Sequence, residues 1–180
     1  MKNKWLPILG LVLLAACTGG EKPSFTCPQA GLAPDAGAIP VFNAAGTEMA
    51  VYAGFNGYKG ACVASKGGIE IEITLDFLAK QGTGGKDTET QDFPYFIALL
   101  APDETILQRQ AFSTSVSFDN TGMGLSREEH SIRLPLQDLK TAGAHKVVFG
   151  FALTPEQLAF NKKKRPAKDP APENSDRKKP

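Results

Sequence analysis

Residue types that commonly carry catalysis are sparse in this chain. Only two histidines occur, His130 and His145, and neither lies in a metal-binding pattern such as HExxH. We expect both histidines at exposed strand ends. The run Gly-Met-Gly-Leu-Ser at residues 122–126 is only superficially similar to the GxSxG turn that presents a nucleophilic serine. The sequence therefore predicts no catalytic residue, no cofactor and no enzymatic activity.

Acidic side chains are the other candidates for chemistry. Glu70, Glu72 and Asp76 would share one face of a strand and could bind a cation. A row of carboxylates on a solvated strand usually serves solubility instead. The run Asp-Asn-Thr-Gly at residues 119–122 is similar to part of a calcium loop but lacks the later glutamate of an EF-hand. We therefore predict no metal site.

The N-terminus carries a more specific pattern. Lys2 and Lys4 precede an apolar run at residues 5–14. A membrane-spanning helix needs about 20 apolar residues, so this run is too short to span a membrane. A positive start, an apolar segment of about 7–15 residues and small residues at its end are typical of a secretory signal peptide. This pattern predicts a signal peptide at residues 1–16.

Leu14-Ala15-Ala16-Cys17 ends the apolar run and resembles the lipobox of bacterial lipoproteins. The resemblance implies that Cys17 receives diacylglycerol, that the chain is cut just before it, and that the new amine is acylated, for example with palmitate. Two or more acyl chains anchor a protein stably, whereas one chain does so only marginally. By resemblance to enterobacterial sorting, Thr18 favours the outer membrane, facing the periplasm. The alternative is an ordinary signal peptide in which Cys17 is incidental.

The other two cysteines are Cys27 and Cys62. Disulfides form and persist in exported proteins, so we predict a disulfide between these two residues once Cys17 carries lipid. The alternative is two separate buried thiols. No CxxC motif occurs, which leaves a thioredoxin-like redox role without support.

Apolar residues recur with the period of β-strands from residue 49 onward. In the clearest strand, the apolar positions that alternate with polar ones are Ile69, Ile71, Ile73, Leu75 and Phe77. Such alternation places one face in a core and the other in water. Asn56-Gly57, between apolar runs at residues 49–55 and 58–64, predicts a two-residue hairpin turn.

The second half of the chain continues the strand pattern. We expect strands at residues 95–101, 105–112, 131–136 and 146–153. Residues 113–118 either extend the second of these strands or form a separate one. The run Thr-Pro-Glu-Gln at residues 154–157 is a capping box and predicts a short helix that ends near Asn161.

About seven strands without βαβ alternation predict an all-β fold, an antiparallel immunoglobulin-like β-sandwich rather than a barrel. We assign residues 1–16 to the signal peptide, 17–40 to a lipidated tether, 41–160 to the β-sandwich and 161–180 to a disordered tail. The Leu-Thr-Pro-Glu-Gln-Leu segment at residues 153–158 also resembles small uncharacterised proteobacterial envelope lipoproteins. That resemblance implies no activity.

Charge is distributed unevenly along the chain. Residues 18–160 hold ten Lys and Arg against sixteen Asp and Glu, whereas residues 161–180 hold eight against three. The basic tail opens with Lys162, Lys163, Lys164 and Arg165. Such an arm could bind an anionic envelope polymer or lipid, or it could be solvated without a partner. Export removes the protein from nucleic acids, so we expect no nucleic-acid partner.

Together these patterns predict a membrane-anchored envelope lipoprotein that serves as a structural or protein-interaction module with an envelope protein partner. The alternative is a binding module for an envelope glycan or lipid that uses the acidic face or the basic tail. A hydrolase has the least support.

The lipid anchor can be tested by a single substitution. Cys17→Ala removes the thiol that would carry diacylglycerol, so the variant should leave the membrane fraction and lose labelling by radioactive fatty acid. A Cys17→Ala variant that sediments with membranes as the wild type does would rule out the anchor.

Overall fold

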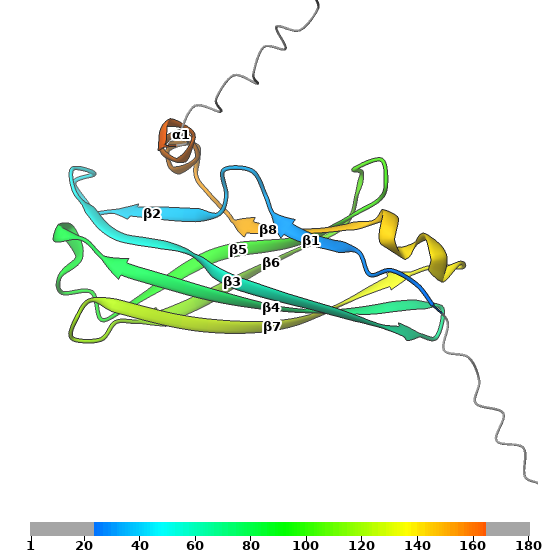
Figure 1. Ribbon diagram of the computed structural model, residues 1–180. Helices are drawn as coiled ribbons and strands as arrows, with labels where there is room; N and C mark the ends of the chain where they lie inside the picture. Colours follow the sequence, from blue (N-terminus) through cyan, green and yellow to red (C-terminus); the bar gives the residue numbers. More distant parts are fainter. Residues whose placement is uncertain (1–23, 165–180) are drawn as a thin grey trace, which may run out of the picture.

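The computed structural model describes residues 24–164, which form two four-stranded β-sheets around a shared core (Figure 1). The strands are β1 (Gln29–Leu32), β2 (Ala38–Phe42), β3 (Met49–Ser65), β4 (Gly68–Gln81), β5 (Thr90–Leu100), β6 (Ile106–Ser117), β7 (Met123–Pro135) and β8 (Lys146–Phe151). Two 3₁₀ helices, η1 (Thr83–Gly85) and η2 (Leu139–Ala144), and one α-helix, α1 (Pro155–Lys164), complete the fold. The predicted signal peptide, Cys17 and Arg165 lie outside the described residues.

The strand order confirms the all-β prediction, with eight strands rather than about seven. Sheet 1 has the order β1-β8-β5-β6 and sheet 2 the order β2-β3-β4-β7. Neighbouring strands are antiparallel except β1 and β8, which are parallel. The last two strands, β7 and β8, therefore lie in different sheets.

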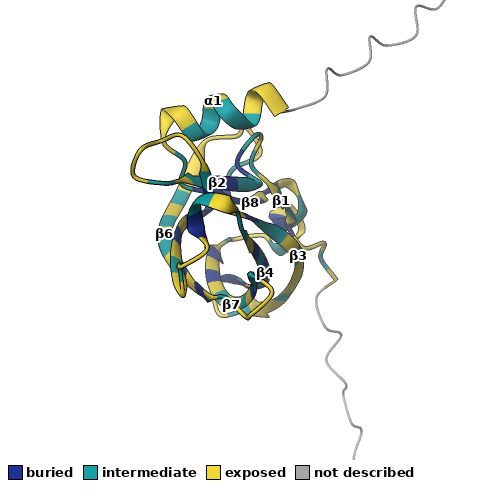
Figure 2. Ribbon diagram, turned by 90° about the vertical axis from the view of Figure 1, so that its left-hand side faces the viewer, coloured by how far each residue is buried: buried dark blue, intermediate teal, exposed yellow. Residues whose placement is uncertain are grey.

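The core confirms the alternation predicted for β4. Its five inward apolar side chains, from Ile69 to Phe77, are at most 5% exposed. They meet the aromatic residues of sheet 1, with ring centroids 5.0 Å apart for Phe77 and Tyr95, while Phe55 of β3 lies 4.7 Å from Phe151. Figure 2 shows exposed residues alternating with more buried ones along β6. Complete burial of each such side chain stabilises the folded state by about 1.5–3 kcal/mol, so this packing holds the sheets together.

Two short turns join neighbouring strands. Gly67 and Gly68 connect β3 to β4, and Gly68 has φ +155°, with an added Cβ only 2.1 Å from the Leu134 carbonyl oxygen. The Pro102-Asp103-Glu104 turn connects β5 to β6. β6 runs without interruption to Ser117, so residues 113–117 extend the strand that we expected at residues 105–112.

The hairpin predicted at Asn56-Gly57 is wrong. β3 runs through these residues as one strand of 17 residues, and only a β-bulge between Phe55 and Gly57 marks them. β4 pairs with β3 on both sides of the bulge, from Val51 with Gln81 to Ser65 with Gly68. This long ladder outweighs the local turn preference, and the bulge absorbs the extra residue.

The boundaries of the predicted tether and tail also change. β1 and most of β2 fall within residues 17–40, and β1 pairs with β8 from Gln29 with Lys146 onward, so they belong to the sheets. α1 continues to Lys164 rather than ending near Asn161. The predicted capping box is confirmed at its start: the Gln157 amide donates to Thr154 Oγ1 at 3.3 Å, and the Thr154 amide donates to Gln157 Oε1 at 2.9 Å.

Cys27 and Cys62 form the predicted disulfide, with Cα atoms 5.9 Å apart. Cys27 leads into β1 of sheet 1, whereas Cys62 lies in β3 of sheet 2, so the bond crosses between the sheets. Among residues 24–164, no helix has the length and apolar character needed to cross a membrane.

Loss of this disulfide should measurably destabilise the fold. The bond closes a loop with a sequence separation of 35 residues, which corresponds to about 4 kcal/mol on the chain-entropy model. Chemical denaturation of a Cys27→Ser and Cys62→Ser double variant should show this loss against the oxidised wild type. Reductant should lower the stability of the wild type to that of the double variant and should leave the stability of the double variant unchanged. Equal unfolding midpoints for both oxidised proteins would contradict the prediction.

Candidate functional site

The edge of β2 is covered by helix α1 (Figure 1). An uncovered edge strand offers unpaired backbone groups to other chains, and folded proteins usually protect such edges. The side-chain amide of Gln157 donates to the Pro40 carbonyl at 2.8 Å, and that of Asn161 donates to the Ala38 carbonyl at 2.7 Å. Pro40 also lacks a backbone N–H. The free side of β2 therefore offers few backbone groups to which another strand could hydrogen-bond.

The edges of β6 and β7 are protected by polar side chains that meet between them. Thr114 Oγ1 donates to Glu128 Oε1 at 2.8 Å and lies 2.7 Å from Ser126 Oγ. Farther along, the Tyr95 hydroxyl is 2.7 Å from His130 Nε2. Inward-pointing charged and polar residues are a recognised protection of sheet edges, and here they occupy the seam between the two sheets.

The two histidines are not at exposed strand ends, so that prediction is wrong. His130 lies within β7, which begins at Met123 rather than near residue 131, and its ring centroid is 4.2 Å from that of Phe112. His145 is only 8% exposed, and its Nδ1 lies 3.1 Å from the Thr141 carbonyl oxygen. Both rings are packed and hydrogen-bonded, as expected for structural histidines.

Burial keeps the Tyr95–His130 pair uncharged. It lowers the pKa of His130, an effect that nearby Glu128 partly opposes, and it raises the pKa of Tyr95. A neutral imidazole can accept the hydrogen bond that the Tyr95 hydroxyl donates, whereas a protonated one cannot. The pair therefore serves packing and stability at neutral pH.

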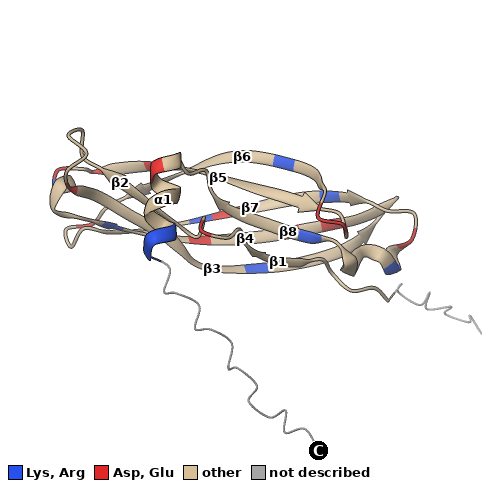
Figure 3. Ribbon diagram, turned by 90° about the horizontal axis from the view of Figure 1, so that it is seen from above, with Lys and Arg blue, Asp and Glu red and all other residues tan. Residues whose placement is uncertain are grey.

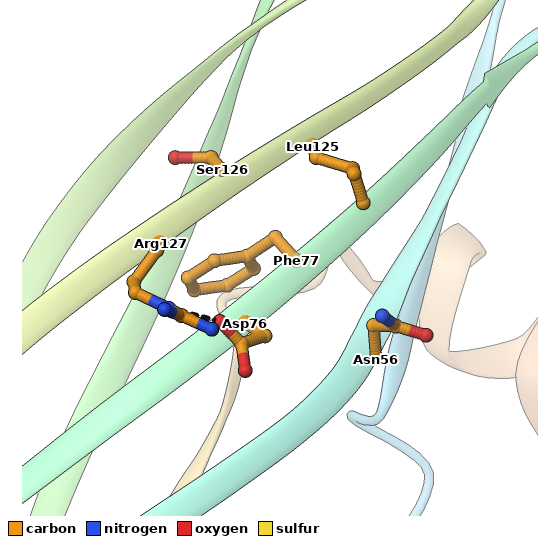
Figure 4. A pocket seen from close by; sticks show the side chains of 6 residues that line it. All are labelled: Asn56, Asp76, Phe77, Leu125, Ser126 and Arg127. Carbon is orange, nitrogen blue, oxygen red and sulfur yellow. Dashed lines mark hydrogen bonds and ion pairs between the residues drawn. The ribbon is translucent and has the colours of Figure 1, made fainter.

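The acidic face of sheet 2 is already neutralised in part. Arg127 Nε donates to Asp76 Oδ1 at 2.6 Å, and this hydrogen bond lowers the pKa of Asp76 (Figure 4). Glu70 accepts a hydrogen bond from the Ser131 hydroxyl. In Figure 4 the ion pair and Asn56 border a shallow hollow of about 390 Å³ beside the β3 bulge. Such an exposed ion pair contributes little energy to stability.

The run at residues 119–122 forms a turn. Asp119 Oδ1 accepts hydrogen bonds from the amides of Thr121 and Met123 at 2.8 and 3.1 Å and from the Thr121 hydroxyl at 2.6 Å. These bonds lower the pKa of Asp119 and occupy its carboxylate. Residues 24–164 contain no cluster of His, Cys, Asp and Glu side chains suited to a metal ion.

Three of the four predicted anion-binding residues, all lysines, gather on the last turn of α1 (Figure 3). Lys162 and Lys163 are exposed, and Lys164 Nζ lies over two aromatic rings, 4.7 Å from the Phe160 centroid and 5.3 Å from that of Tyr52. Cations also interact favourably with the negative end of a helix, so their position has a structural reason.

The second half of β3 differs from these edges. Residues 57–65 pair only with β4 within the described chain, because β2 pairs with β3 no farther than Gly54. β1 likewise pairs only with β8 in that part of the chain. The two free edges lie side by side in Figures 1 and 3, and the Tyr58 hydroxyl bridges them by donating to the Ala30 carbonyl at 3.2 Å.

Between these edges is a cavity of about 200 Å³, which we name the β1–β3 slot. Its floor is apolar, since Ile71, Ile73 and Val147 are at most 5% exposed. Gly60 faces this floor opposite Ile73 and, having no side chain, leaves the space above it open. The slot is lined by Cys27, Pro28, Ala30, Tyr58, Gly60, Ala61, Ile71, Glu72, Ile73 and Val147.

Sequence reasoning missed the β1–β3 slot because its features are free backbone edges and not reactive side chains. One signal was available: Tyr58, Gly60 and Cys62 share the inward face of β3, and the glycine interrupts it. Comparisons with protein-family models, with curated proteins and with solved structures found no significant match to this chain.

The buried His130 should make stability depend on pH. Its pKa lies below the usual 6.5, so the unfolded chain binds the proton more readily than the folded one. The stability that neutral His130 contributes is complete above about pH 6.5 and is lost as the pH falls through the lowered pKa. Between about pH 7.5 and pH 5, denaturant unfolding of the wild type should show a larger loss of stability than that of His130→Gln. Equal losses in the two proteins would contradict this role.

Proposed function

We propose that this protein is a non-enzymatic envelope lipoprotein that binds an extended segment of a partner protein at the β1–β3 slot. The observation that carries the proposal is the contrast between edges. α1 covers β2, and side-chain networks fill the β6–β7 seam, but residues 57–65 of β3 have an edge beside an apolar cavity that no strand among residues 24–164 pairs with. An unprotected edge next to a side-chain pocket has the parts that strand addition requires.

Strand addition divides the task of binding between backbone and side chains. Backbone hydrogen bonds to β3 would supply affinity for any extended chain, and the cavity above Ile71 and Ile73 would select the side chain that fills it. Residues 57–65 contain one charge, Lys59, so little opposes an approaching strand. Val63 on the same stretch is 54% exposed and would be covered by a partner.

The proposal places the protein in the outer membrane, facing the periplasm, through acyl chains on Cys17. It rests on the lipobox-like residues 14–17 and on the Cys27–Cys62 disulfide, which suits an exported protein. We also propose that the two sheets form an immunoglobulin-like β-sandwich in the broad sense of two facing, largely antiparallel sheets. In immunoglobulin domains the last two strands share a sheet, so the separation of β7 and β8 gives this protein its own strand order.

A second candidate function is binding to an anionic envelope polymer or lipid. The cluster of Lys162, Lys163 and Lys164 at the end of α1 favours it. The acidic face of sheet 2 does not support it, because carboxylates repel an anionic ligand. Salt-sensitive binding of the purified protein to anionic vesicles or peptidoglycan, lost when the three lysines become glutamine, would identify this function.

Blocking the slot should abolish partner binding without unfolding the protein. In Gly60→Val the new side chain would fill the cavity, and an added Cβ there meets only the Glu72 carbonyl oxygen at 3.9 Å. A photo-crosslinking amino acid at Val63 should capture a defined envelope protein in cells, and Gly60→Val should reduce that product at least about tenfold.

Gly31→Val is the matched control, since a Cβ at Gly31 meets nothing within 4 Å. It makes the same chemical change on β1 and should leave the crosslink intact. Equal capture by wild type, Gly60→Val and Gly31→Val would reject the slot as the binding site.

A further inference from the structure

We propose that the outer face of sheet 1 lies on the phospholipid surface that carries the anchor, with Ile106 and Leu107 inserted into the headgroup layer. This inference rests on the anchoring part of the proposed function and adds a second contact between the protein and the bilayer. It follows from the apolar character of this face, from the charge of the opposite face and from the place where the chain enters the fold.

Strand register gathers apolar side chains on the outer face of sheet 1. Alternate residues of β5 and β8 fill the core, so the residues between them point outward. On that outer side Ala98 pairs with Val148 of β8, and Leu100 pairs with Ile106 of β6. We name this surface the sheet 1 patch, which consists of Phe96, Ala98, Leu100, Ile106, Leu107 and Val148.

The two most exposed members of the patch lie at the start of β6. Ile106 is 58% exposed and Leu107 is 51% exposed, although both are large apolar side chains. Phe96, Leu100 and Val148 are partly buried beside them. A contiguous exposed apolar surface of this kind is typical of a site that contacts another protein or a membrane.

Charge distinguishes the two outer faces of the molecule. In sheet 1 the charged residues that point outward are Asp92, Arg109 and Lys146. The outer face of sheet 2 carries Lys59, Glu70, Glu72, Asp76, Lys80, Arg127, Glu129 and Arg133. Charged side chains enter lipid only at high cost, so the face of sheet 1 is the one suited to approach a bilayer.

The charged groups around the patch suit the headgroup layer. The Arg109 guanidinium carbon lies 4.4 Å from the Phe96 ring centroid, so its apolar stem covers the sheet while its charge stays at the surface. Lys146 Nζ is 2.8 Å from Glu104 Oε1, so this pair adds no net charge. Asp103 in the adjoining turn stays ionised, because a backbone hydrogen bond lowers its pKa, and this carboxylate limits insertion to the headgroup layer.

The chain enters the fold beside the patch. The first described residue is Ser24, and β1 begins at Gln29. Gln29 pairs with Lys146, which in turn pairs with Leu100 of the patch. Figure 1 shows this entry at the end of the molecule that holds η2 and the β5–β6 turn.

The length of the preceding chain selects the bilayer as the occupant. Cys17 precedes Ser24 by seven residues, so an extended chain allows at most about 25 Å between Ser24 and lipid carried on Cys17. The bilayer is therefore present beside the patch at a high effective concentration, which a partner in solution does not reach. An apolar surface at this place would be covered by lipid first.

Tryptophan placed on the patch can report contact with lipid. The chain has one tryptophan, Trp5, which would leave with the signal peptide, so the mature wild type should show no tryptophan emission. The lipidated protein with Leu107→Trp, reconstituted in phospholipid vesicles, should show emission that brominated acyl chains quench at least about twofold. Leu125→Trp is the matched control, because Leu125 is 69% exposed on the outer face of sheet 2, and its emission should not be quenched.

A second substitution tests whether apolar insertion causes the quenching. Ile106→Asp in the Leu107→Trp protein places a charge beside the reporter, so it should abolish quenching while the protein stays bound to vesicles. Quenching that persists in this variant would contradict insertion. Quenching that disappears at about 1 M salt, where the screening length is about 3 Å, would also contradict it, because the contact would then be electrostatic.

The outcomes separate this inference from the proposed anchor. Vesicle-bound protein in which both reporters, or neither, are quenched would overturn the inference and leave the anchor intact. A blue-shifted but unquenched Leu107→Trp reporter would show that a second copy of the chain covers the patch, and it would overturn the inference as well. Tryptophan emission from the wild type, or release of the protein from vesicles, would overturn both the anchor and the inference.

Discussion

The covalent bond between Cys27 and Cys62 is the constraint on which the shape of this molecule's open side depends. β1 is held to sheet 1 by a four-residue parallel ladder. Within residues 24–164 the disulfide, the Tyr58–Ala30 hydrogen bond and side-chain packing position it against β3. The bond brings the two edges to 5.9 Å at one end, and Gly60 leaves them open beyond it. The slot is therefore produced by one crosslink and one missing side chain, within a core that the aromatic residues of both sheets already stabilise.

The features that the sequence predicted correctly are those whose signals are local. The alternation predicted for β4 is confirmed because each inward residue, such as Phe77, is buried whichever strand pairs with β4. The capping box at Thr154 and Gln157 likewise depends on residues three apart. Asn56-Gly57 misled because the pairing partner of residues 57–65 is β4, and that ladder is not visible in the turn itself. β1 has no local signal at all, since its strand conformation is imposed by β8, more than a hundred residues away.

The candidate site was beyond sequence reasoning for a related reason. Searching for reactive side chains led to His130, His145 and the carboxylates of β4, and packing or ion pairing accounts for the histidines and for Asp76. A free backbone edge leaves no signal in the sequence, because every residue except proline offers the same backbone donor and acceptor. Whether an edge is free depends on what covers it, and that is decided by α1 for β2 and by Thr114 and Glu128 for the β6–β7 seam. Only the complete fold distinguishes the edge that is left uncovered.

The proposed anchor and the proposed slot constrain each other. Cys17 precedes Cys27 by ten residues, and an extended chain spans at most about 3.6 Å per residue, so the Cys27–Cys62 disulfide beside the slot lies within about 36 Å of lipid carried on Cys17. A partner segment that binds the slot must therefore lie within a few tens of ångströms of the same membrane. This geometry selects proteins that are themselves held at the membrane, because tethering both partners raises their effective concentration there. Tethering of both partners therefore lets a short paired segment contribute more to binding than it would in solution.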